Sequence, residues 1–560
     1  MKPLIECVPN FSEGVQQEVI DQICEEISSV EGVKLLDVDP GKATNRTVVT
    51  FVGAPKPVIE AAYLAIKKAA SLIDMSKHSG EHPRMGATDV CPLIPISGIT
   101  MEETVKYAEA LGERVGQELG IPVYLYESAA KKPERKNLAT VRAGEYEGLA
   151  TKMNDPDWKP DYGPDTFNAK SGATAIGVRD FLVAYNINLN TTSVRRANAV
   201  AFDVREKGRI KREGHPLTGK IMRDAEGNPL REAGKLKSVK AIGWYIEEYG
   251  LAQISMNLTD INETSLHKAF ETVRECANQR GLRVTGSELV GLVPKKVLLE
   301  AGKYFLKQQE RSLGITELEI MHIAIKSLGL DELGPFDPKK KVIEYLLEED
   351  SARPLVNKTL IGFADETASE SPAPGGGSIS AYVGALGAAL GGMVANLSAH
   401  KRGWDEKWSY YSSYAVMAQD IKDRLIQLVD EDTTAFNKIL EALRMPKSSE
   451  EEKQLRSKSI AAATRYAIEV PLTVMKTSYE SYALLEEMAQ SGLKASISDA
   501  AVGALCTHTA VEGAYLNVKI NCKDFDDKEF VTQALSEANT ILDQSGKKKQ
   551  QILKTVNDHL

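Results

Sequence analysis

The sequence predicts two fold classes in one chain, an α+β region that extends to about Ile325 and an all-α helical bundle that begins at Arg353. Three observations lead to this prediction. Strand-like and helix-like segments alternate in the first region, and strand patterns disappear from the second. A stretch rich in Gly, Pro and Lys, GLDELGPFDPKKK, separates the two regions. At 560 residues the chain is long enough to bury several cores.

The α+β region shows one order of elements twice. The first run has two strands around a Pro-Gly turn (KLLDVDPGKATNRTVVTFVG), a helix (VIEAAYLAIKKAASLI), a buried strand (CPLIPI), a helix (MEETVKYAEALGERVGQELG) and a strand (IPVYLYESAA). The second run, from Arg179, has a strand (FLVAYNINL), a helix (SVRRANAVAFDVREKG), two strands (VKAIGWYIEEYGLAQISMNLTD) and a helix (SLHKAFETVRECANQRG), followed by VTGSELVGLVP. The similar order predicts two related subdomains, residues 1–178 and 179–326.

The second region has helical patterns throughout. We expect helices at Thr359–Ser369, Gly376–Lys401, Lys407–Leu443, Glu450–Ser491, Ser498–Asn521 and in a charged terminal segment. Long helices without strands are typical of a helical bundle. The sequence therefore predicts a helical domain over residues 353–560, joined to the first region by a linker at 327–352.

Composition narrows the functional classes. Charged residues make up 26% of the chain and hydrophobic residues 42%, as in ordinary globular proteins, and the net charge of −9 argues against a nucleic-acid partner. The six cysteines form no CxxC pair, which argues against a disulfide framework or a Cys-rich zinc site. The start, MKPLIECVPNFSEG, lacks the apolar core of a signal peptide. A cytoplasmic location is therefore expected.

One segment is long enough to test for a membrane span. Residues 371–399 contain no charged side chain, and a helix of this length could cross a bilayer. Gly, Ala and Ser dominate the segment, however, so its insertion into lipid is at best weakly favourable. We expect a buried helix whose small residues allow a neighbouring helix to approach closely, and no membrane span.

His82 is the first candidate catalytic residue. The run from His78 through Glu81 to His82 matches H-x-x-E-H, a zinc motif that requires a helix. Gly80 and Pro83 favour a loop instead, which argues against a metal site. His82 alone would be a general acid/base, because only imidazole titrates near neutral pH without perturbation. The structural alternative is a loop histidine satisfied by hydrogen bonds.

Two further polar residues precede His82. Asp39 lies at a predicted strand end, where its carboxylate would orient an imidazole, and Arg46 would hold a substrate carboxylate bidentately. The structural alternatives are that Asp39 begins a turn before Pro40 and that Arg46 is a solvated strand residue.

Two segments have a composition suited to ligands. The run DYGPDTFNAKSGAT at 161–174 is a Gly/Pro/Ser loop whose backbone amides would approach a flat ligand, although most such loops only connect elements. A basic cluster follows at Arg195, Arg196, Lys207, Arg209, Lys211 and Arg212. Such a cluster suits a polyanionic ligand, and its structural alternative is a solvated face.

Asp432 is the candidate catalytic residue of the helical region. It falls on an apolar stripe formed by Leu425, Leu428, Val429, Phe436, Ile439, Leu440 and Leu443. Burial raises the pKa of a carboxyl group, which suits a proton shuttle, but a buried ion pair would give the same pattern. The APGGGS run at a helix start is a possible anion site, and Asn517 and Asn521 lie one turn apart.

Several of these segments carry a family resemblance. IECVPNFSEG, LDVDPGKATNRTVVTFVG, HSGEHPRMGATDVCPLIPI and GPDTFNAKSGATAIGVRDFLVAYNINL resemble glutamate formimidoyltransferases. ESPAPGGGSISAYVGALGAALGGMV, LVDEDTTAF and GAYLNVKIN resemble formimidoyltetrahydrofolate cyclodeaminases. In this order the two sets resemble the bifunctional formimidoyltransferase-cyclodeaminase family over nearly the whole chain.

The resemblance implies a two-step reaction of histidine degradation. The formimino group would pass from N-formimino-L-glutamate to N-5 of tetrahydrofolate, and ring closure would then give 5,10-methenyltetrahydrofolate and ammonia. Tetrahydrofolate, in polyglutamate form, would be a co-substrate, with no metal and no permanently bound cofactor. The resemblance also implies two ferredoxin-like subdomains, a helical deaminase bundle, and a homo-oligomer that is a ring of dimers.

The resemblance assigns roles to individual residues of this sequence. His82 would be the catalytic histidine of transfer and Asp432 the acid/base of cyclodeamination, and the roles inferred above for Asp39 and Arg46 fit this reaction. The folate-binding loop would comprise Gly163, Pro164, Asp165, Thr166, Phe167, Asn168, Ala169, Lys170, Ser171 and Gly172. Two alternatives stay open from the residues alone: a transferase whose helical half only oligomerises, and a non-enzymatic folate-binding scaffold.

Overall fold

The computed structural model describes residues 3–560 except 43, 81–82, 215–218, 349–352 and 524. Its contacts divide the chain into unit 1, Met1–Val297 with Leu328–Leu347, and unit 2, Leu298–Ser327 with Glu348–Leu560. Strands and helices build unit 1, whereas unit 2 is helical. The predicted succession of an α+β region and an all-α region is therefore confirmed.

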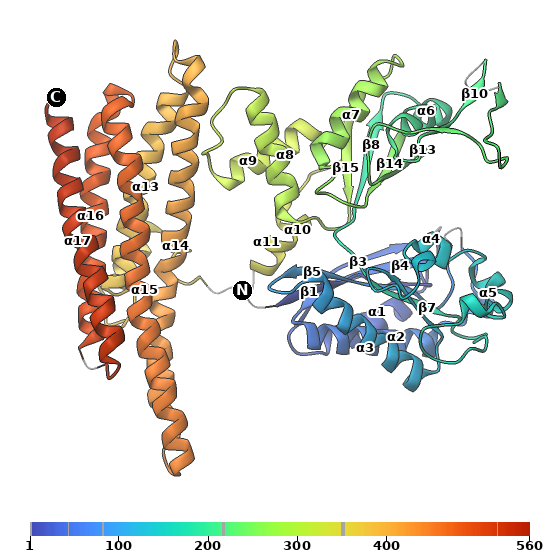
Figure 1. Ribbon diagram of the computed structural model, residues 1–560, viewed down its shortest axis with the longest axis horizontal. Coiled ribbons are helices and arrows are strands. Elements are labelled where there is room, and N and C mark those ends of the chain that lie inside the picture. The colour runs from blue at the N-terminus through green and yellow to red at the C-terminus, as the bar shows by residue number, and fades with distance from the viewer. Residues whose placement is uncertain (1–2, 43, 81–82, 215–218, 349–352, 524) are drawn as a thin grey trace. The chain divides into compact units, whose positions relative to one another are not determined.

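The first subdomain of unit 1 is a seven-stranded sheet with its three longer helices against one face (Figure 1). Its strands are β1 (Leu4–Cys7), β2 (Asn10–Phe11), β3 (Val33–Gly41), β4 (Arg46–Gly53), β5 (Thr88–Ser97), β6 (Val123–Glu127) and β7 (Thr174–Val178). Its helices are α1 (Gln17–Ser28), α2 (Pro55–Leu72), α3 (Met101–Leu119), α4 (Leu138–Val141) and α5 (Glu145–Met153). β7 pairs in parallel with β5 and β6, and the other pairings are antiparallel.

Alternation along the strands gives this sheet one apolar and one polar face. In β4, Val49 and Phe51 are fully buried in the core formed with the helices. Arg46, Val48 and Thr50 of the same strand face the opposite side, where they line a cavity. α1, α2 and α3 therefore cover one face, α4 and α5 cover part of the other face over β6 and β7, and the remainder of that second face is available for a ligand.

The second subdomain has the order β-α-β-β-α-β and a four-stranded antiparallel sheet with spatial order β13-β14-β8-β15. This order is that of a ferredoxin-like fold. The first subdomain contains the same arrangement, with spatial order β3-β4-β1/β2-β5 and with α1 and α2 as its two helices. The predicted pair of ferredoxin-like subdomains is therefore confirmed. The elements are β8 (Val183–Leu189), α6 (Val194–Val204), β13 (Val239–Ile246), β14 (Leu251–Leu258), α7 (Leu266–Asn278) and β15 (Val284–Val290).

Four two-residue strands lie between α6 and β13. They form two small antiparallel pairs, β10 with β11 and β12 with β9. Their bounds are β9 (Arg209–Ile210), β10 (Arg212–Glu213), β11 (Lys220–Ile221) and β12 (Arg231–Glu232). This excursion was not predicted, because strands of two residues carry no readable alternation.

The boundaries between the two units differ from the predicted domain boundaries. The division falls within α8 (Lys295–Gln308) and at the end of α9 (Glu317–Leu328). Most of the expected linker packs on unit 1: it contains α10 (Pro338–Lys341) and α11 (Ile343–Glu348), and Val342 forms a parallel bridge with Val293. The segment between α8 and α9 packs in unit 2, where the backbone N–H of Leu313 donates to Ser412 Oγ (2.9 Å).

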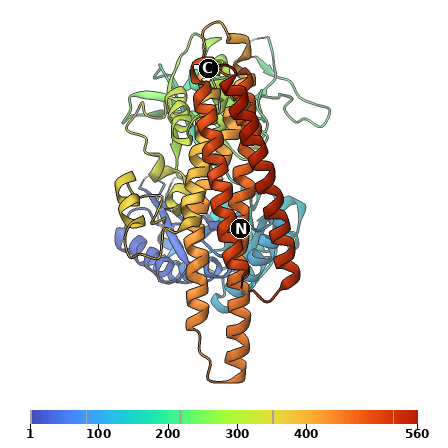
Figure 2. The same ribbon diagram turned by 90° about the vertical axis from the view of Figure 1, so that its left-hand side faces the viewer.

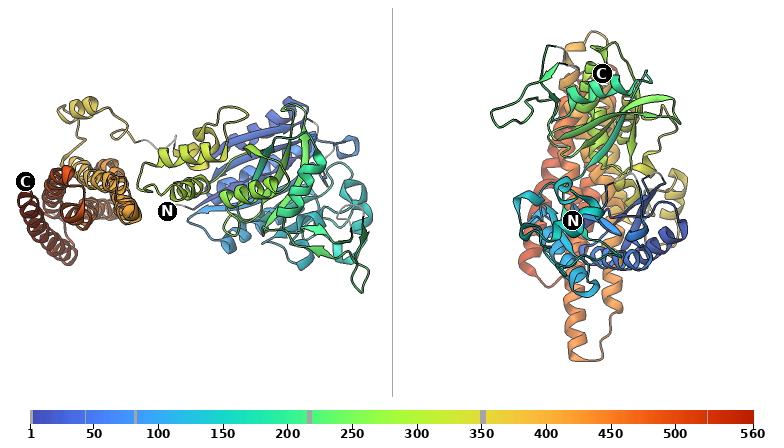
Figure 3. Two further views of the ribbon diagram at one scale, coloured as in Figure 1. Left: turned by 90° about the horizontal axis from the view of Figure 1, so that it is seen from above. Right: turned by 90° about the vertical axis from the view of Figure 1, so that its right-hand side faces the viewer.

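Unit 2 is a bundle of long helices, seen nearly end-on in Figure 3 (left). Every helix predicted from residue 359 onward is present, and the predicted ends differ from the observed ends by at most a few residues. The helices are α12 (Leu360–Thr367), α13 (Gly376–Ala399), α14 (Trp408–Arg444), α15 (Glu450–Ser491), α16 (Ile497–Cys522) and α17 (Lys528–Asn557). α14 and α15 extend as a two-helix projection beyond the rest of the bundle (Figure 2).

α13 is the charge-free helix considered above as a possible membrane span. Among the described residues it is the single helix that meets the length and hydropathy criteria for crossing a membrane, and 61% of its most apolar window is buried inside the protein. Its glycines allow close helix packing. A Cβ at Gly387 would lie 2.8 Å from Thr507 Oγ1 and 3.0 Å from the carbonyl oxygen of Gly503, both on α16. α13 therefore has the features of a core helix.

Candidate active sites

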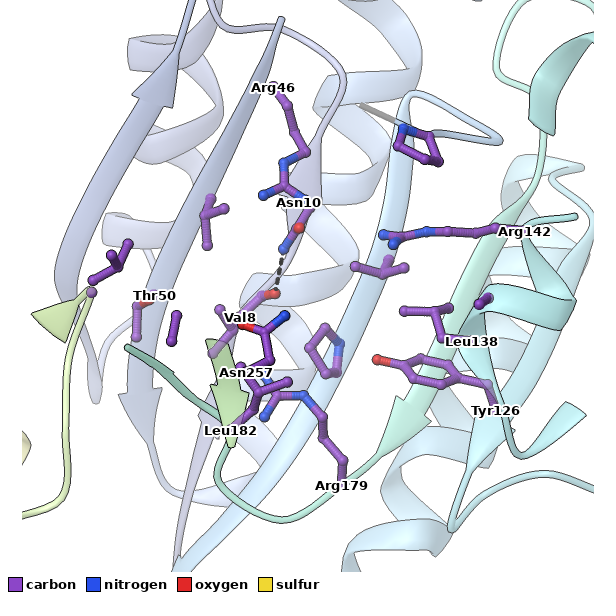
Figure 4. Close-up of a pocket in the computed structure, with 18 of the residues that line it drawn as sticks. Val8, Asn10, Arg46, Thr50, Tyr126, Leu138, Arg142, Arg179, Leu182 and Asn257 are labelled. Atoms are coloured by element: carbon purple, nitrogen blue, oxygen red, sulfur yellow. Dashed lines mark hydrogen bonds between the residues drawn. The ribbon is translucent and has the colours of Figure 1, made fainter. Parts of the chain in front are cut away.

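A cavity of about 640 Å³ lies in unit 1 and is lined by both subdomains (Figure 4). The polar faces of β1, β3, β4 and β5 supply one wall, and β8, β13, β14 and β15 supply residues of the other. Its size is within the range typical of small-molecule sites. The polar side chains that line it are Glu6, Asn10, Asp37, Asp39, Arg46, Thr50, Tyr126, Arg142, Glu145, Arg179, Lys240 and Asn257.

Glu6 is the buried carboxyl group of this cavity. Only 4% of the residue is exposed, and no hydrogen bond to its side chain comes from the described part of the chain. Burial raises its pKa to about 7, because loss of water disfavours the charged form, and the positive charge of Arg179 only partly offsets this effect. Glu6 can therefore exist in either protonation state near neutral pH.

Three guanidinium groups enter the cavity from different elements (Figure 4). Arg46 comes from β4, Arg142 follows α4, and Arg179 follows β7. Arg142 is paired with the fully buried carboxylate of Asp89. Burial and the neighbouring Arg142 lower the pKa of Arg46. Four acidic side chains, Glu6, Asp37, Asp39 and Glu145, line the same cavity, so it offers partners for both anionic and cationic groups of a substrate.

The structure brings two of the predicted residues of the first site together. Asp39, near the end of β3, and Arg46 both line the cavity. His82 lies outside the described residues. Its neighbour in the sequence, Pro83, lines the same cavity.

His78 has a structural role that argues against the zinc motif. Residues 78–80 are not helical, whereas the zinc motif requires a helix that begins at its first histidine. Arg84 Nε donates to Nδ1 of His78 (3.2 Å), and Nε2 of His78 lies 2.9 Å from the carbonyl oxygen of Asn45. Both ring nitrogens are therefore engaged within the protein.

The predicted folate loop, Gly163–Gly172, supplies none of the residues that line the cavity. Asn168 Nδ2 donates to the carbonyl oxygen of Gly120 (3.2 Å), and the ring of Phe167 lies 5.4 Å from that of Tyr146. Tyr146 follows Glu145, which lines the cavity, so the loop is one helix removed from it. Folate binding by this loop stays a prediction.

A second, smaller pocket of about 130 Å³ lies in unit 2. Three features that the sequence indicated separately meet there: the Ala-Pro-Gly-Gly-Gly run before α13, Asp432 of α14, and two asparagines of α16. The lining residues are Pro372, Ala373, Gly375, Gly376, Asp432, Thr433, Ala435, Phe436, Ile439, Ala467, Asn517 and Asn521.

Asp432 lies against the N-terminus of α13. Its Oδ2 accepts a hydrogen bond from Ser378 Oγ (3.2 Å), and a Cβ at Gly377 would lie only 2.1 Å from its Oδ1. Burial raises the pKa of Asp432, while the Ser378 side-chain and backbone hydrogen bonds act in the opposite direction. A carboxyl group in this position can store a proton. It also caps α13, whose N-cap residue Gly375 has no side-chain cap.

The apolar stripe around Asp432 is buried only in part. Leu425, Leu428 and Val429 are buried, but Phe436 is 41% and Leu443 is 47% exposed. The predicted apolar stripe is therefore buried up to Val429, and its side chains from Phe436 onward are half-buried or exposed. Asp430, two residues from Asp432, instead accepts the backbone N–H of Leu355 (2.9 Å).

Sequence reasoning missed Glu6, Arg142, Arg179, Lys240 and Asn257. One feature of the sequence could have indicated Glu6: it is the single charged residue in the run LIECV. The first four residues of this run form β1, which pairs with a strand on each side. The other residues come from loops and from the second sheet, and only the packing of the two subdomains brings them to one cavity.

Three family descriptions match successive parts of the chain. They are "Formiminotransferase domain, N-terminal subdomain" over residues 4–179, "Formiminotransferase domain" over 184–348 and "Formiminotransferase-cyclodeaminase" over 359–540.

Individual proteins are similar over all or part of the chain. A formimidoyltransferase-cyclodeaminase of Mus musculus is 44% identical over 546 residues, 97% of each chain. A glutamate formimidoyltransferase of Streptococcus pyogenes is 42% identical over 310 residues, 55% of this chain and 95% of that protein. A methenyltetrahydrofolate cyclohydrolase of Methylorubrum extorquens is 34% identical over 200 residues, 36% of this chain and 96% of that protein.

Proposed function

The chain belongs to the formimidoyltransferase-cyclodeaminase family, and we propose that it converts N-formimino-L-glutamate and tetrahydrofolate into L-glutamate, 5,10-methenyltetrahydrofolate and ammonia in two steps. The observation that carries this proposal is the presence of two chemically different sites. One is a large cavity in unit 1 lined by both arginine and carboxyl side chains, and the other is a small pocket beside the half-buried carboxyl group of Asp432 in unit 2.

The first step belongs to the cavity of unit 1. N-5 of tetrahydrofolate attacks the formimino carbon, and the resulting tetrahedral adduct loses the amine of glutamate. A base must take a proton from N-5, and an acid must give one to the departing amine. We assign this proton transfer to His82, oriented by Asp39, and we assign the binding of a substrate carboxylate to Arg46. The support is the position of Asp39, Arg46 and Pro83 on one cavity.

Glu6 has a separate role in this proposal. The formimino group is an amidine, so its protonated form is a flat cation with two N–H-bearing nitrogens, as in an arginine fork. A buried carboxylate is the natural partner of such a cation. We propose that Glu6 pairs with the formimino group and holds its carbon in position for attack. Because its pKa is raised to about 7, Glu6 can lose its proton and become a carboxylate when the cationic formimino group binds.

The second step belongs to the pocket of unit 2. N-10 of 5-formiminotetrahydrofolate attacks the formimino carbon and closes a five-membered ring. The proton of N-10 passes to the exocyclic nitrogen, which then takes one further proton and leaves as ammonia, so that the methenyl cation remains. We propose that the Asp432 carboxyl supplies this proton. The small pocket has room for the reacting ring, while the rest of the folate would extend outward past Phe436, whose side chain is partly exposed.

The proposal predicts a fixed stoichiometry. With tetrahydrofolate present, each formiminoglutamate consumed should yield one glutamate and one ammonia, and both products should be absent without tetrahydrofolate. Glutamate release without ammonia would instead support a transferase whose helical unit only oligomerises. Folate binding without either product would support a non-enzymatic scaffold.

We also propose that the chain assembles into a homo-oligomer through unit 2. The support is a row of large apolar side chains that remain exposed on α13, where Leu386, Met393 and Leu397 are 40–44% exposed. These positions repeat at helical spacing and form one face. Val502 and Leu505 of α16 are exposed to a similar extent. A second copy of the same face would bury them.

The proposed compartment is the reducing cytoplasm. All six cysteines are free thiols in the structure, including Cys7 and Cys91, whose sulfur atoms lie 3.5 Å apart. A reducing compartment keeps such a pair unbonded. Fractionation of cells that express the chain would test the proposal, and recovery outside the cytoplasmic fraction would contradict it.

A further inference from the structure

A second polar cavity lies in unit 1, on the second subdomain. It has a volume of about 470 Å³ and is lined by α6, the short strands β9, β10 and β12, and Arg280 beyond α7. It shares no lining residue with the substrate cavity. Its polar lining consists of one asparagine, Asn198, and seven arginines, Arg195, Arg196, Arg205, Arg209, Arg212, Arg231 and Arg280, which we call the arginine pocket.

The charges of the arginine pocket are only partly balanced. Asp203 pairs with two of the seven, Arg209 and Arg280 (Arg280 Nη2 to Oδ2, 2.5 Å). The other five form no ion pair with any residue in the described parts of the chain. The pKa values of Arg205 and Arg209 are lowered by burial and, in addition, by the nearby charges of Arg231 and Arg280 respectively. Like charges gathered without counter-charges raise the free energy of the folded protein.

Several of these guanidinium groups are held in place. Arg205 Nε donates to the carbonyl oxygen of Gly208 (3.0 Å), and its guanidinium lies 4.2 Å from the centre of the Phe202 ring. Arg212 Nη1 donates to the carbonyl oxygen of Gly219 (2.9 Å). A guanidinium has five N–H donors. These anchors use one or two of them, so the groups are oriented and retain donors for a ligand.

We propose that the arginine pocket is a binding site for a small polyanion with closely spaced oxyanion groups, such as a ligand that carries several phosphates. Guanidinium groups bind phosphate and carboxylate oxygens bidentately, and several guanidiniums around one cavity match several charges on one ligand. A solvated basic face would have its arginines spread over the surface or interleaved with acidic side chains. Here they surround a hollow on a chain whose net charge is −9.

The test measures the binding of inorganic tripolyphosphate and of citrate to the full chain by isothermal titration calorimetry at two salt concentrations. The variant is R195Q/R196Q, because both residues are exposed at the start of α6 and no side-chain hydrogen bond of either is seen within the described residues. The matched control is K268Q/K296Q, which removes the same charge from exposed positions of unit 1 outside the pocket. Circular dichroism verifies that each variant is folded.

We expect saturable 1:1 binding that weakens at least tenfold in R195Q/R196Q, stays within twofold in the control, and weakens with salt. Tighter binding of tripolyphosphate would identify phosphate groups as the ligand chemistry, and tighter binding of citrate would identify clustered carboxylates. The proposal is overturned if neither anion binds below millimolar concentration, or if R195Q/R196Q binds as the parent chain does. Since no enzymatic step is measured, the outcome is independent of the proposed two-step reaction.

Discussion

Glu6 and Asp432 are carboxyl groups of different sites, and burial raises the pKa of each. They differ in what surrounds them. Glu6 is buried in the wall of a cavity and accepts no side-chain hydrogen bond from the described residues, whereas Asp432 lies against a helix N-terminus and accepts hydrogen bonds from Ser378. The first environment suits the pairing of a carboxylate with a cationic substrate group, and the second suits the holding and release of a proton.

The pKa of Glu6 makes the stability of unit 1 depend on pH. The folded chain holds a proton on Glu6 up to about pH 7, whereas an unfolded chain loses it near pH 4.5. The folded state therefore binds more protons between these values, and stability falls as pH rises through them. The loss at pH 8 relative to pH 4.5 amounts to roughly 3 kcal/mol. E6Q should lack this part of the pH dependence.

Urea unfolding of the parent chain and of E6Q at pH 5 and pH 8 measures the effect. E102Q is the control, because Glu102 is exposed on α3. Equal changes with pH in the parent chain and in E6Q would contradict the assigned pKa. E6Q should also raise the KM for formiminoglutamate, since an amide cannot pair with a cation as a carboxylate does.

Asp432 is expected to act in the second step alone. D432N should slow ammonia release from 5-formiminotetrahydrofolate by at least about a hundredfold, because loss of a general acid typically has this magnitude. Glutamate release should be unchanged. D430N is the matched control: Asp430 lies two residues away and binds the backbone of residues 355 and 356.

G377A tests whether ammonia release depends on the position of the Asp432 carboxylate as well as on its presence. A Cβ at residue 377 would displace the Asp432 carboxylate without removing it. If Asp432 supplies the proton, G377A should also lose ammonia release while its thermal unfolding stays close to that of D430N. Full ammonia release by either D432N or G377A would exclude Asp432 from the chemistry.

The sequence could predict Asp432 because a helix has a regular period. Leu425, Leu428 and Val429 mark one face, and Asp432 follows on that face one turn later. The cavity of unit 1 was not predictable in the same way. Glu6 and Arg179 are 173 positions apart, and their proximity depends on how strands pair in a sheet and how two subdomains pack.

Among the elements, α13 depends most on small residues. Valine at position 387 would place its Cβ 2.8 Å from Thr507 Oγ1 of α16. This clash can be relieved only if α13 and α16 move apart. Overpacking of this kind typically costs about 1–3 kcal/mol. G387V should therefore lower the free energy of unfolding of unit 2, as measured by urea titration.

The control for G387V is G148A in α5. No atom lies within 4 Å of a Cβ at Gly148, and its φ is not positive. Alanine there should be neutral or slightly stabilising, because glycine lowers the stability of a helix interior. A stability of G387V equal to that of the parent chain would mean that α13 and α16 do not pack as described.

Predictability differed between elements for a physical reason. The long helices α14, α15 and α16 were predicted with nearly correct ends, because their apolar residues repeat over many turns. The short strands β9–β12 were not predicted, and neither was the arginine pocket to which three of them contribute residues. The sequence indicated the basic cluster, but its closure around a cavity depends on these tertiary pairings.

At the scale of the whole molecule, the chain contains two units with separate sites, and the proposed self-association involves only one of them. L386D should place a charge on the exposed apolar row of α13, where a partner copy would bury it. Analytical ultracentrifugation should then show a smaller species than for the parent chain. An unchanged mass for L386D, or a monomeric parent chain, would contradict assembly through this face.

The central claim is that one chain performs two consecutive steps in two sites, and complementation between variants tests it most directly. Formiminoglutamate and tetrahydrofolate are supplied to H82A, to D432N and to an equal mixture of both, and glutamate and ammonia are measured together. H82A alone should release neither product, D432N alone should release glutamate without ammonia, and the mixture should release both. Ammonia release by D432N alone, or failure of the mixture when both variants are folded, would contradict the account.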